Sequence, residues 1–195
     1  MEELPLAAPR ERADAARNRE RIVNSARALF AERGAANVSL DEVARAAGVG
    51  KATLFRRFGD RQALFLALLD EHERDLQERL LRGPPPLGPP AEPRARLHAF
   101  ADALLDLSLA HRELLLGSET ARPLARVSTG AYGVWHRHVS LLIAQARPGS
   151  DADVLAHLML AAFDAELITA LDEGGVPSSR IRDALHDAVD RLVRP

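Results

Sequence analysis

The sequence has 195 residues, with 26 lysines and arginines against 28 aspartates and glutamates, and it contains no cysteine. The lack of cysteine excludes a disulfide framework, a thiolate metal site and a cysteine nucleophile, and it favours a reducing, cytoplasmic location. No apolar run approaches the roughly 20 residues that a membrane-spanning helix needs, and residues 1–10 lack the basic and apolar segments of a signal peptide. We therefore expect no membrane partner.

Charge is divided unevenly along the chain. Residues 10–61 contain 12 basic and 7 acidic side chains, a net charge of +5, whereas residues 62–195 have a net charge of −5. The overall net charge of −2 therefore conceals a basic segment, and a basic segment is what binding to nucleic-acid phosphates requires. This division predicts two parts with different functions.

The basic segment has short, sharply bounded helical patterns. Gly34 supplies a left-handed stop for the first helix, and Ser39 with Glu42 has the spacing of a capping box at the start of the second. The glycines of residues 48–50 predict a tight turn before the third helix. Apolar periodicity predicts helices over about residues 14–33, from residue 40, over 51–58, and from 60 to 82.

The remainder of the chain predicts further helices and no strand. Residues 83–93 hold six prolines, which excludes helix and favours an extended, polyproline-like crossing. Further apolar patterns predict helices ending near residue 110, then over 111–116, 122–146, 152–171 and 178–193. The expected fold class is all-α: an N-terminal three-helix helix-turn-helix domain, joined by a long helix to a C-terminal helical bundle.

A short helix, a glycine turn and a second short helix match the helix-turn-helix plan, in which the second helix enters the DNA major groove. Helical geometry buries Leu54 and Phe58 of the 51–58 helix and turns Ala52, Thr53 and Arg56 outward. Arg56 could pair with guanine, the Thr53 methyl with thymine, and the small Ala52 allows close approach.

Phosphate contacts are expected around this reading helix. Lys51, Arg57 and Arg61 are the candidate basic contacts, with Phe55 on the flank of the outer face. The Ser39 hydroxyl, at the N-terminus of the preceding helix, forms a second candidate phosphate site. The alternative is a small three-helix bundle whose arginines are a solvated face, and the pattern alone does not separate the two interpretations.

A family resemblance covers about residues 19–69. It is carried by an apolar-Ala-Leu-Phe helix that ends at Gly34, by an Ala-Gly-Val turn at residues 47–49, and by the Thr-Leu-aromatic-x-x-Phe pattern of residues 53–58. Arg61 and Leu64-Phe65 extend it. The segment resembles the N-terminal domain of TetR-type transcriptional repressors.

The resemblance implies a homodimer whose N-terminal domains, residues 14–59 here, bind a palindromic double-stranded operator. Residues 60–195 would be the connector helix with a ligand-binding and dimerisation domain, and residues 1–13 a disordered arm. Binding of a small effector would release the DNA, which makes the protein a transcriptional regulator and most simply a repressor. Departures from the family pattern are Phe55 for a frequent Tyr, Gly50 for Ser, Arg57 for His and Arg61 for Lys.

The C-terminal candidates follow from this resemblance and from apolar patterning. The last two long helices would pair with their symmetry mates, and the expected dimer interface is Leu155, Leu158, Met159, Ala162, Phe163, Ile181, Leu185, Val189 and Leu192. Trp135, His138 and Phe163 are the candidate contacts for a small apolar or amphipathic effector. The alternative is that some of these apolar residues close the core of one subunit; we favour dimerisation.

Two other classes of function remain. A helical adaptor without specific DNA binding would keep the bundle, and a metal-dependent helical enzyme would use histidines and carboxylates. The sequence contains no E-x-x-H and no other catalytic motif, so we expect no enzyme activity, no catalytic residue, no metal and no cofactor. His98 with Asp102, and Asp153 with His157, have i, i+4 spacing, for which a helical salt bridge is the commoner outcome.

Overall fold

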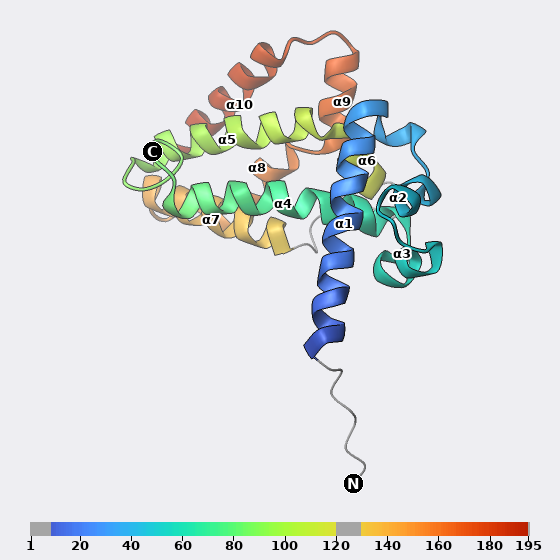
Figure 1. Cartoon of the computed structure of the whole chain (residues 1–195). Coiled ribbons are helices and arrows are strands. Elements are labelled where there is room, and N and C mark those ends of the chain that lie inside the picture. The colour runs from blue at the N-terminus through green and yellow to red at the C-terminus, as the bar shows by residue number, and fades with distance from the viewer. Residues whose placement is uncertain (1–8, 120–129, 195) are drawn as a thin grey trace. The chain divides into compact units, whose positions relative to one another are not determined.

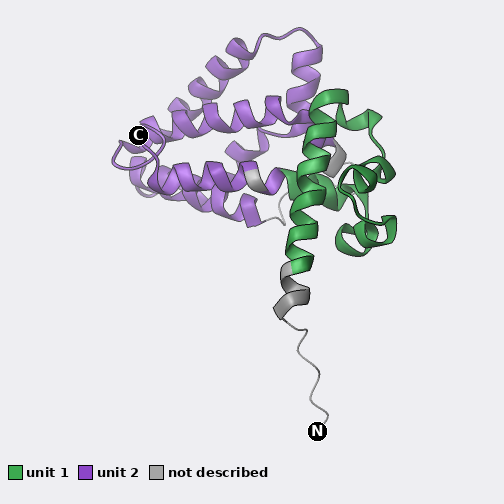
Figure 2. Ribbon diagram, in the orientation of Figure 1, with its two compact units in different colours: residues 1–68 green, residues 69–195 purple. Residues whose placement is uncertain are grey.

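The structure of the protein is a computed structural model that describes residues 9–119 and 130–194. In these ranges the chain forms helices and turns and no strand (Figure 1), so the predicted all-α fold class is confirmed. Two compact units divide it: unit 1, Met1–Leu68, and unit 2, Leu69–Pro195 (Figure 2).

Unit 1 contains the short elements that the sequence predicts. They are α1 (Pro9–Arg33), the 3-10 turn η1 (Ala35–Asn37), α2 (Leu40–Ala46), α3 (Lys51–Phe58) and the first turns of α4 (Arg61–Arg82). Helix α1 packs on η1 and α2, and α2 packs on α3. Ile22, Val43, Leu54 and Leu64 are fully buried between them.

Two boundaries of unit 1 differ from the sequence analysis. Helix α1 begins at Pro9 and not near residue 14, because proline is well tolerated in the first turn of a helix. Residues 1–8 of the expected arm lie outside the described residues. Unit 1 extends to Leu68, past residue 59, because the start of α4 belongs to its core: the Phe65 ring meets the Phe30 ring of α1 edge to face at 5.5 Å.

Unit 2 surrounds the central helix α5 (Pro93–Ala110). The other elements are the rest of α4, α6 (Arg112–Glu119), α7 (Gly130–Ala146), α8 (Ala152–Ala161), α9 (Ala165–Glu173) and α10 (Ser178–Val193). Helix α5 packs against α7 and α10, and α7 packs against α8. Leu97, Phe100, Leu104, Trp135 and Ile143 are fully buried in this core.

The helix expected over residues 152–171 is broken in two, with a bend of 41° between α8 and α9. The Asp164 carboxylate accepts a hydrogen bond from the Leu167 N–H at 3.0 Å and starts a new helix. No single helix in the described ranges is long and apolar enough to cross a membrane. The bent α8–α9 pair has that length and composition together, but it buries Met159, Leu160 and Phe163 in the core of unit 2.

The proline-rich segment before α5 is a turn and not the extended crossing that the sequence predicts. The Gly88 N–H donates to the Pro84 carbonyl at 3.0 Å, and Leu87 is buried against the core of unit 2. Burial of this one leucine folds the segment back, which its proline content alone does not indicate. Residues 122–129 of the helix expected over 122–146 lie outside the described residues. The rest of that helix is α7.

Candidate nucleic-acid interface

Helix α3 has one buried and one exposed face. Leu54 is fully buried and Phe58 nearly so, and these two side chains fix the helix in unit 1. Thr53 is half-buried at the edge of the outer face. The exposed side chains of the helix are Lys51, Ala52, Phe55, Arg56 and Arg57. The candidate base-reading residues therefore lie together on the accessible side of the helix.

The turn between α2 and α3 is set by glycine. Gly48 has a φ of 62°, in the left-handed region that L side chains rarely adopt. A Cβ on Gly48 would lie 2.6 Å from Nη2 of Arg21, which donates to the Gly48 carbonyl at 3.3 Å. Gly50 caps α3 without a side-chain hydrogen bond, so the first backbone N–H groups of α3 have no side-chain cap.

The basic side chains of α3 differ in how they are engaged. Lys51 Nζ lies 2.8 Å from Asp41 Oδ2 in an exposed ion pair and 5.8 Å from the centre of the Phe55 ring. Arg56 and Arg57 form no ion pair with any described residue. Two exposed guanidinium groups without a carboxylate partner are available to an external anion.

Arg61 does not fit its predicted role as a phosphate contact. Its guanidinium donates to the backbone carbonyls of Val38 and Ala35, both buried residues. It also lies 5.9 Å from the centre of the Phe30 ring and 5.0 Å from that of Phe65. These contacts tie α4 to η1 and α1, so Arg61 stabilises unit 1 and is withdrawn from the candidate interface.

Ser39 is likewise engaged within the chain. Its hydroxyl accepts from the Glu42 N–H at 3.3 Å and donates to Glu42 Oε2 at 2.8 Å, and its own N–H donates to the same oxygen at 2.9 Å. The backbone and hydroxyl hydrogen bonds of Ser39, together with that of Arg33, lower the pKa of Glu42 to about 2. The predicted capping box is present, and its ionised carboxylate disfavours phosphate at the site expected beside Ser39.

Arg45 is a candidate that the sequence analysis missed. It is exposed in the last turn of α2 and forms no ion pair among the described residues. It lies four residues after Asp41, outside the buried stripe of Val43 and Ala44. The helical period that turns Arg56 outward on α3 also turns Arg45 away from Val43 on α2, so the sequence contains this signal.

The candidate effector residues lie in unit 2. Trp135 and Phe163 are fully buried in one apolar core, and His138 packs against the Phe100 ring with centres 5.5 Å apart. Burial, with a smaller effect of the Arg96 charge, lowers the pKa of His138 to about 4, so the ring is neutral near pH 7. His138 Nε2 is buried without a hydrogen-bond partner among the described residues.

The expected dimer residues differ in how much of each is buried within the subunit. Phe163 and Ile181 are 0% and 6% exposed and help to close the subunit's own core, as do Val189 and Met159 at 2% and 7%; Leu155 packs against that core while partly exposed. Six of the nine, Val189 and Met159 included, line a hollow of about 370 Å³, the α8–α10 hollow, which Ala101, Arg147, Ala188 and Arg191 complete. These six are Leu158, Met159, Ala162, Leu185, Val189 and Leu192.

Comparison with known proteins is most specific for unit 1. The sequence profile of the family described as bacterial regulatory proteins, tetR family, matches residues 22–68. An uncharacterized HTH-type transcriptional regulator of Mycobacterium tuberculosis is 37% identical over 62 residues, which cover 32% of this chain and 31% of that protein. The chain thus matches about a third of the length of such relatives, and the profile match over residues 22–68 contains α2 and α3.

Solved structures extend the likeness to most of the chain. A TetR-family transcriptional regulator from Streptomyces coelicolor has a TM-score of 0.61 at 21% identity, covering 92% of this chain and 95% of that one. The TetR-family repressor FadR of Thermus thermophilus, solved in complex with lauroyl-CoA, has a TM-score of 0.63 at 20% identity, with coverages of 89% and 92%. At these identities the likeness concerns the fold.

The local and the global comparison agree on one assignment. The profile matches the segment that holds the capping box, the glycine turn and α3, and the fold of both units is that of solved TetR-family regulators. Residues 22–68 thus match the tetR family of bacterial regulatory proteins, and the chain has the fold of solved TetR-family regulators.

Proposed function

We propose that the protein is a sequence-specific DNA-binding transcriptional repressor. The observation that carries this proposal is the outer face of α3, where Arg56 and Arg57 are exposed and have no carboxylate partner among the described residues. Arg56 reads a base, and Arg57 and Arg45 bind phosphates. Lys51 joins them by exchanging its exposed pair with Asp41 for a phosphate, because such pairs contribute little stability.

The working unit is a homodimer. The exposed apolar side chain of Leu158, 63% accessible, lies at the α8–α10 hollow, and an apolar hollow with an exposed leucine favours burial against a second copy. A two-fold dimer presents two α3 helices, so the operator is a palindrome with two half-sites. Leu158→Glu should give monomers in sedimentation velocity, whereas Leu81→Glu, at 62% exposure on α4, should leave dimers.

The effector is an apolar or amphipathic small molecule bound within unit 2. The family fold, the lauroyl-CoA in the related Thermus thermophilus structure and the unpartnered Nε2 of His138 support this. His138, which packs against Phe100 of the core that also holds Trp135 and Phe163, would offer its neutral ring as a hydrogen-bonding group. Binding then shifts the dimer toward a conformation with lower operator affinity.

The decisive experiment is selection of binding sites from random duplex DNA with the full-length chain. We expect enrichment of one palindrome. Arg56→Ala should lower discrimination by about 1–3 kcal/mol at one base pair of each half-site. The matched variant Arg57→Ala should weaken binding to all sequences alike and reduce the salt dependence by about one phosphate contact.

The adaptor interpretation makes the opposite prediction. A chain that uses its basic face only for solvation would enrich no palindrome, and both arginine variants would then change weak binding to the same small extent. Either result would overturn the repressor proposal.

A further inference from the structure

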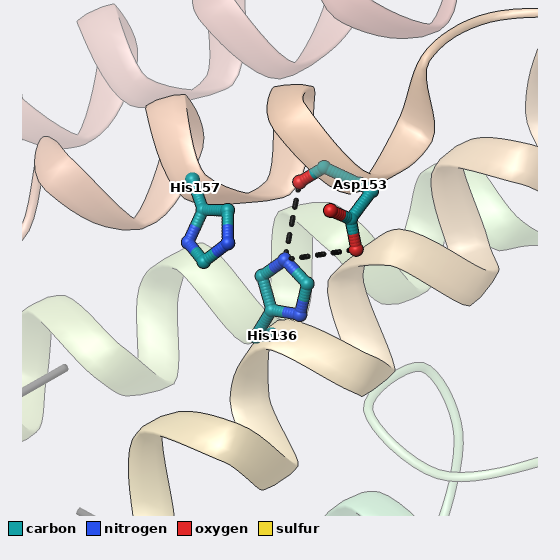
Figure 3. A group of neighbouring side chains, drawn as sticks. All are labelled: His136, Asp153 and His157. Carbon is teal, nitrogen blue, oxygen red and sulfur yellow. Dashed lines mark hydrogen bonds and ion pairs between the residues drawn. The ribbon is translucent and has the colours of Figure 1, made fainter. Parts of the chain in front are cut away.

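Three potential metal ligands meet on the surface of unit 2 where α7 packs against α8. They are His136 from α7 and Asp153 and His157 from α8, shown in Figure 3. One ligand atom from each lies within 4.8 Å of the other two. His136 Nε2 is 3.6 Å from Asp153 Oδ1, and the two imidazole rings stack with their centres 4.0 Å apart.

The fold explains why these side chains meet. Asp153 and His157 are four residues apart and share one face of α8, as helical geometry requires. Trp135 and Val139 of α7 and Ala156 of α8 are buried in the same core, which fixes the register of the two helices. The i, i+4 pair visible in the sequence thus gains its third member from a separate helix, and the sequence spacing alone could not show this.

The cluster differs from the other histidine cluster of unit 2, between α5 and α10. There Arg94 pairs with Asp190, Arg182 pairs with Asp102, and His98 and His186 hydrogen-bond to the same two carboxylates. Asp153 pairs with no lysine or arginine in the described part of the chain, and its side chain is 74% exposed. Its charge is therefore available to a cation, while the carboxylates of the α5–α10 cluster are already neutralised.

Tyr132 gives the cluster an outer support. Its hydroxyl oxygen lies 2.6 Å from Nδ1 of His157. When Nδ1–H of His157 donates a hydrogen bond to this hydroxyl oxygen, His157 keeps the lone pair of Nε2 for a metal ion, which is the usual arrangement around ligating histidines. His136 Nε2 lies 3.1 Å from the Asp153 carbonyl oxygen, a hydrogen bond that metal binding would replace.

We propose that His136, Asp153 and His157 form a binding site for Zn²⁺ or a similar late first-row divalent ion, completed by water. Two imidazoles and one carboxylate suit these ions, whereas Mg²⁺ and Ca²⁺ prefer ligand sets made only of oxygen. Neighbouring ligand atoms of a tetrahedral zinc ion lie about 3.3 Å apart, because each bond is about 2.0–2.1 Å long. The 3.6 Å between His136 and Asp153 is close to this, and exposed side chains can close the remaining distance.

The bound ion would tie α7 to α8. Helix α8 also supplies Leu158 and Met159 to the α8–α10 hollow, so the ion would fix a helix that the proposed dimer uses. The site itself does not depend on DNA binding, and its test requires no DNA.

The test uses the full chain without an affinity tag, freed of metal by a chelator and titrated with ZnCl₂ in a calorimeter. We expect one ion per chain and a rise in the thermal unfolding midpoint followed by Trp135 emission, because a ligand of the folded state stabilises it. MgCl₂ and CaCl₂ at the same concentrations should produce neither effect. Absence of saturable zinc binding, or equal binding of Mg²⁺, would overturn the proposal.

Variants separate this site from adventitious binding. His157→Gln and Asp153→Asn, both at exposed positions, should each lower zinc affinity at least about tenfold, and Tyr132→Phe should lower it less. The matched control His186→Gln removes a histidine of the α5–α10 cluster and should leave the titration unchanged. Equal loss in His186→Gln and His157→Gln, with native circular dichroism in both, would contradict the assignment.

Discussion

The arginines of the two units are used differently. On α3 of unit 1, Arg56 and Arg57 are exposed without a carboxylate partner among the described residues. In unit 2, Arg94 binds Asp190 through two hydrogen bonds of 2.6 and 2.7 Å, and Arg182 binds two carboxylates of α5. Arg94 and Arg182 are thus neutralised within unit 2, whereas Arg56 and Arg57 of unit 1 leave positive charge for an external anion.

Polar groups also stabilise the two units in different ways. In unit 1 they act on the backbone: Ser39 and Glu42 cap α2, and Arg61 binds two carbonyls. In unit 2, Asp164 and Arg96 also bind backbone groups, and ion pairs additionally join side chains of α5 and α10 beside a large apolar core. The ion pairs between distant helices are therefore the feature that unit 2 adds, and variants can separate the two modes.

The largest expected effect comes from matched substitutions that create a cavity in the core of each unit. Leu54 and Leu104 are both fully buried, so Leu54→Ala and Leu104→Ala should each cost about 2–5 kcal/mol. If the units unfold separately, Leu104→Ala lowers the urea midpoint of Trp135 emission, and Leu54→Ala leaves that midpoint unchanged while abolishing operator binding. Equal shifts of Trp135 emission in both variants would show one cooperative unit and remove the comparison.

A smaller loss is expected from Arg61→Lys in unit 1. Lysine keeps the charge but cannot donate to the carbonyls of both Val38 and Ala35 in the same geometry. Leaving a buried carbonyl without a donor should cost about 1–3 kcal/mol, seen as faster hydrogen exchange of unit 1 amides. The exposed control Arg57→Lys should change exchange by less than about 0.5 kcal/mol. Similar exchange in the two variants would place Arg61 back among the candidate DNA contacts.

What the sequence predicted well is what local residues determine. The bounds of α3 and α10 were expected closely because glycines, a proline and the apolar period act within one or two turns. The break before α9 was missed, since Asp164 lies inside an otherwise apolar run and its capping role was hidden. Arg61 binds backbone carbonyls before α2, and Asp102 binds Arg182 and His186 of α10 instead of His98. Both arrangements depend on contacts between distant segments. Spacing along one helix carries no information about these.

A salt titration distinguishes the two kinds of lowered carboxylate. The Ser39 backbone hydrogen bond is the main cause that lowers the pKa of Glu42 to about 2, whereas Arg94 is the main cause for Asp190, also to about 2. Because these values are below those of the unfolded chain, the stabilisation is present above about pH 4 and is lost as the pH falls through about 2. In carboxyl NMR titrations, 1 M NaCl should raise the pKa of Asp190 more than that of Glu42. Equal increases would mean that charge dominates in both units.

The smallest expected effect concerns the ion pair between Lys51 on the outer face of α3 and Asp41. Lys51 and Asp41 are 63% and 51% exposed at the side chain, so a double-mutant cycle with Lys51→Met and Asp41→Asn should give a coupling of about 0.2–1 kcal/mol. A pair this weak can be exchanged for a phosphate at little cost. Asp41→Asn should therefore tighten DNA binding while Lys51→Met weakens it, both at low salt. If Asp41→Asn instead weakened binding, the carboxylate would be positioning Lys51 for the phosphate, and unit 1 would use a paired cation as unit 2 does.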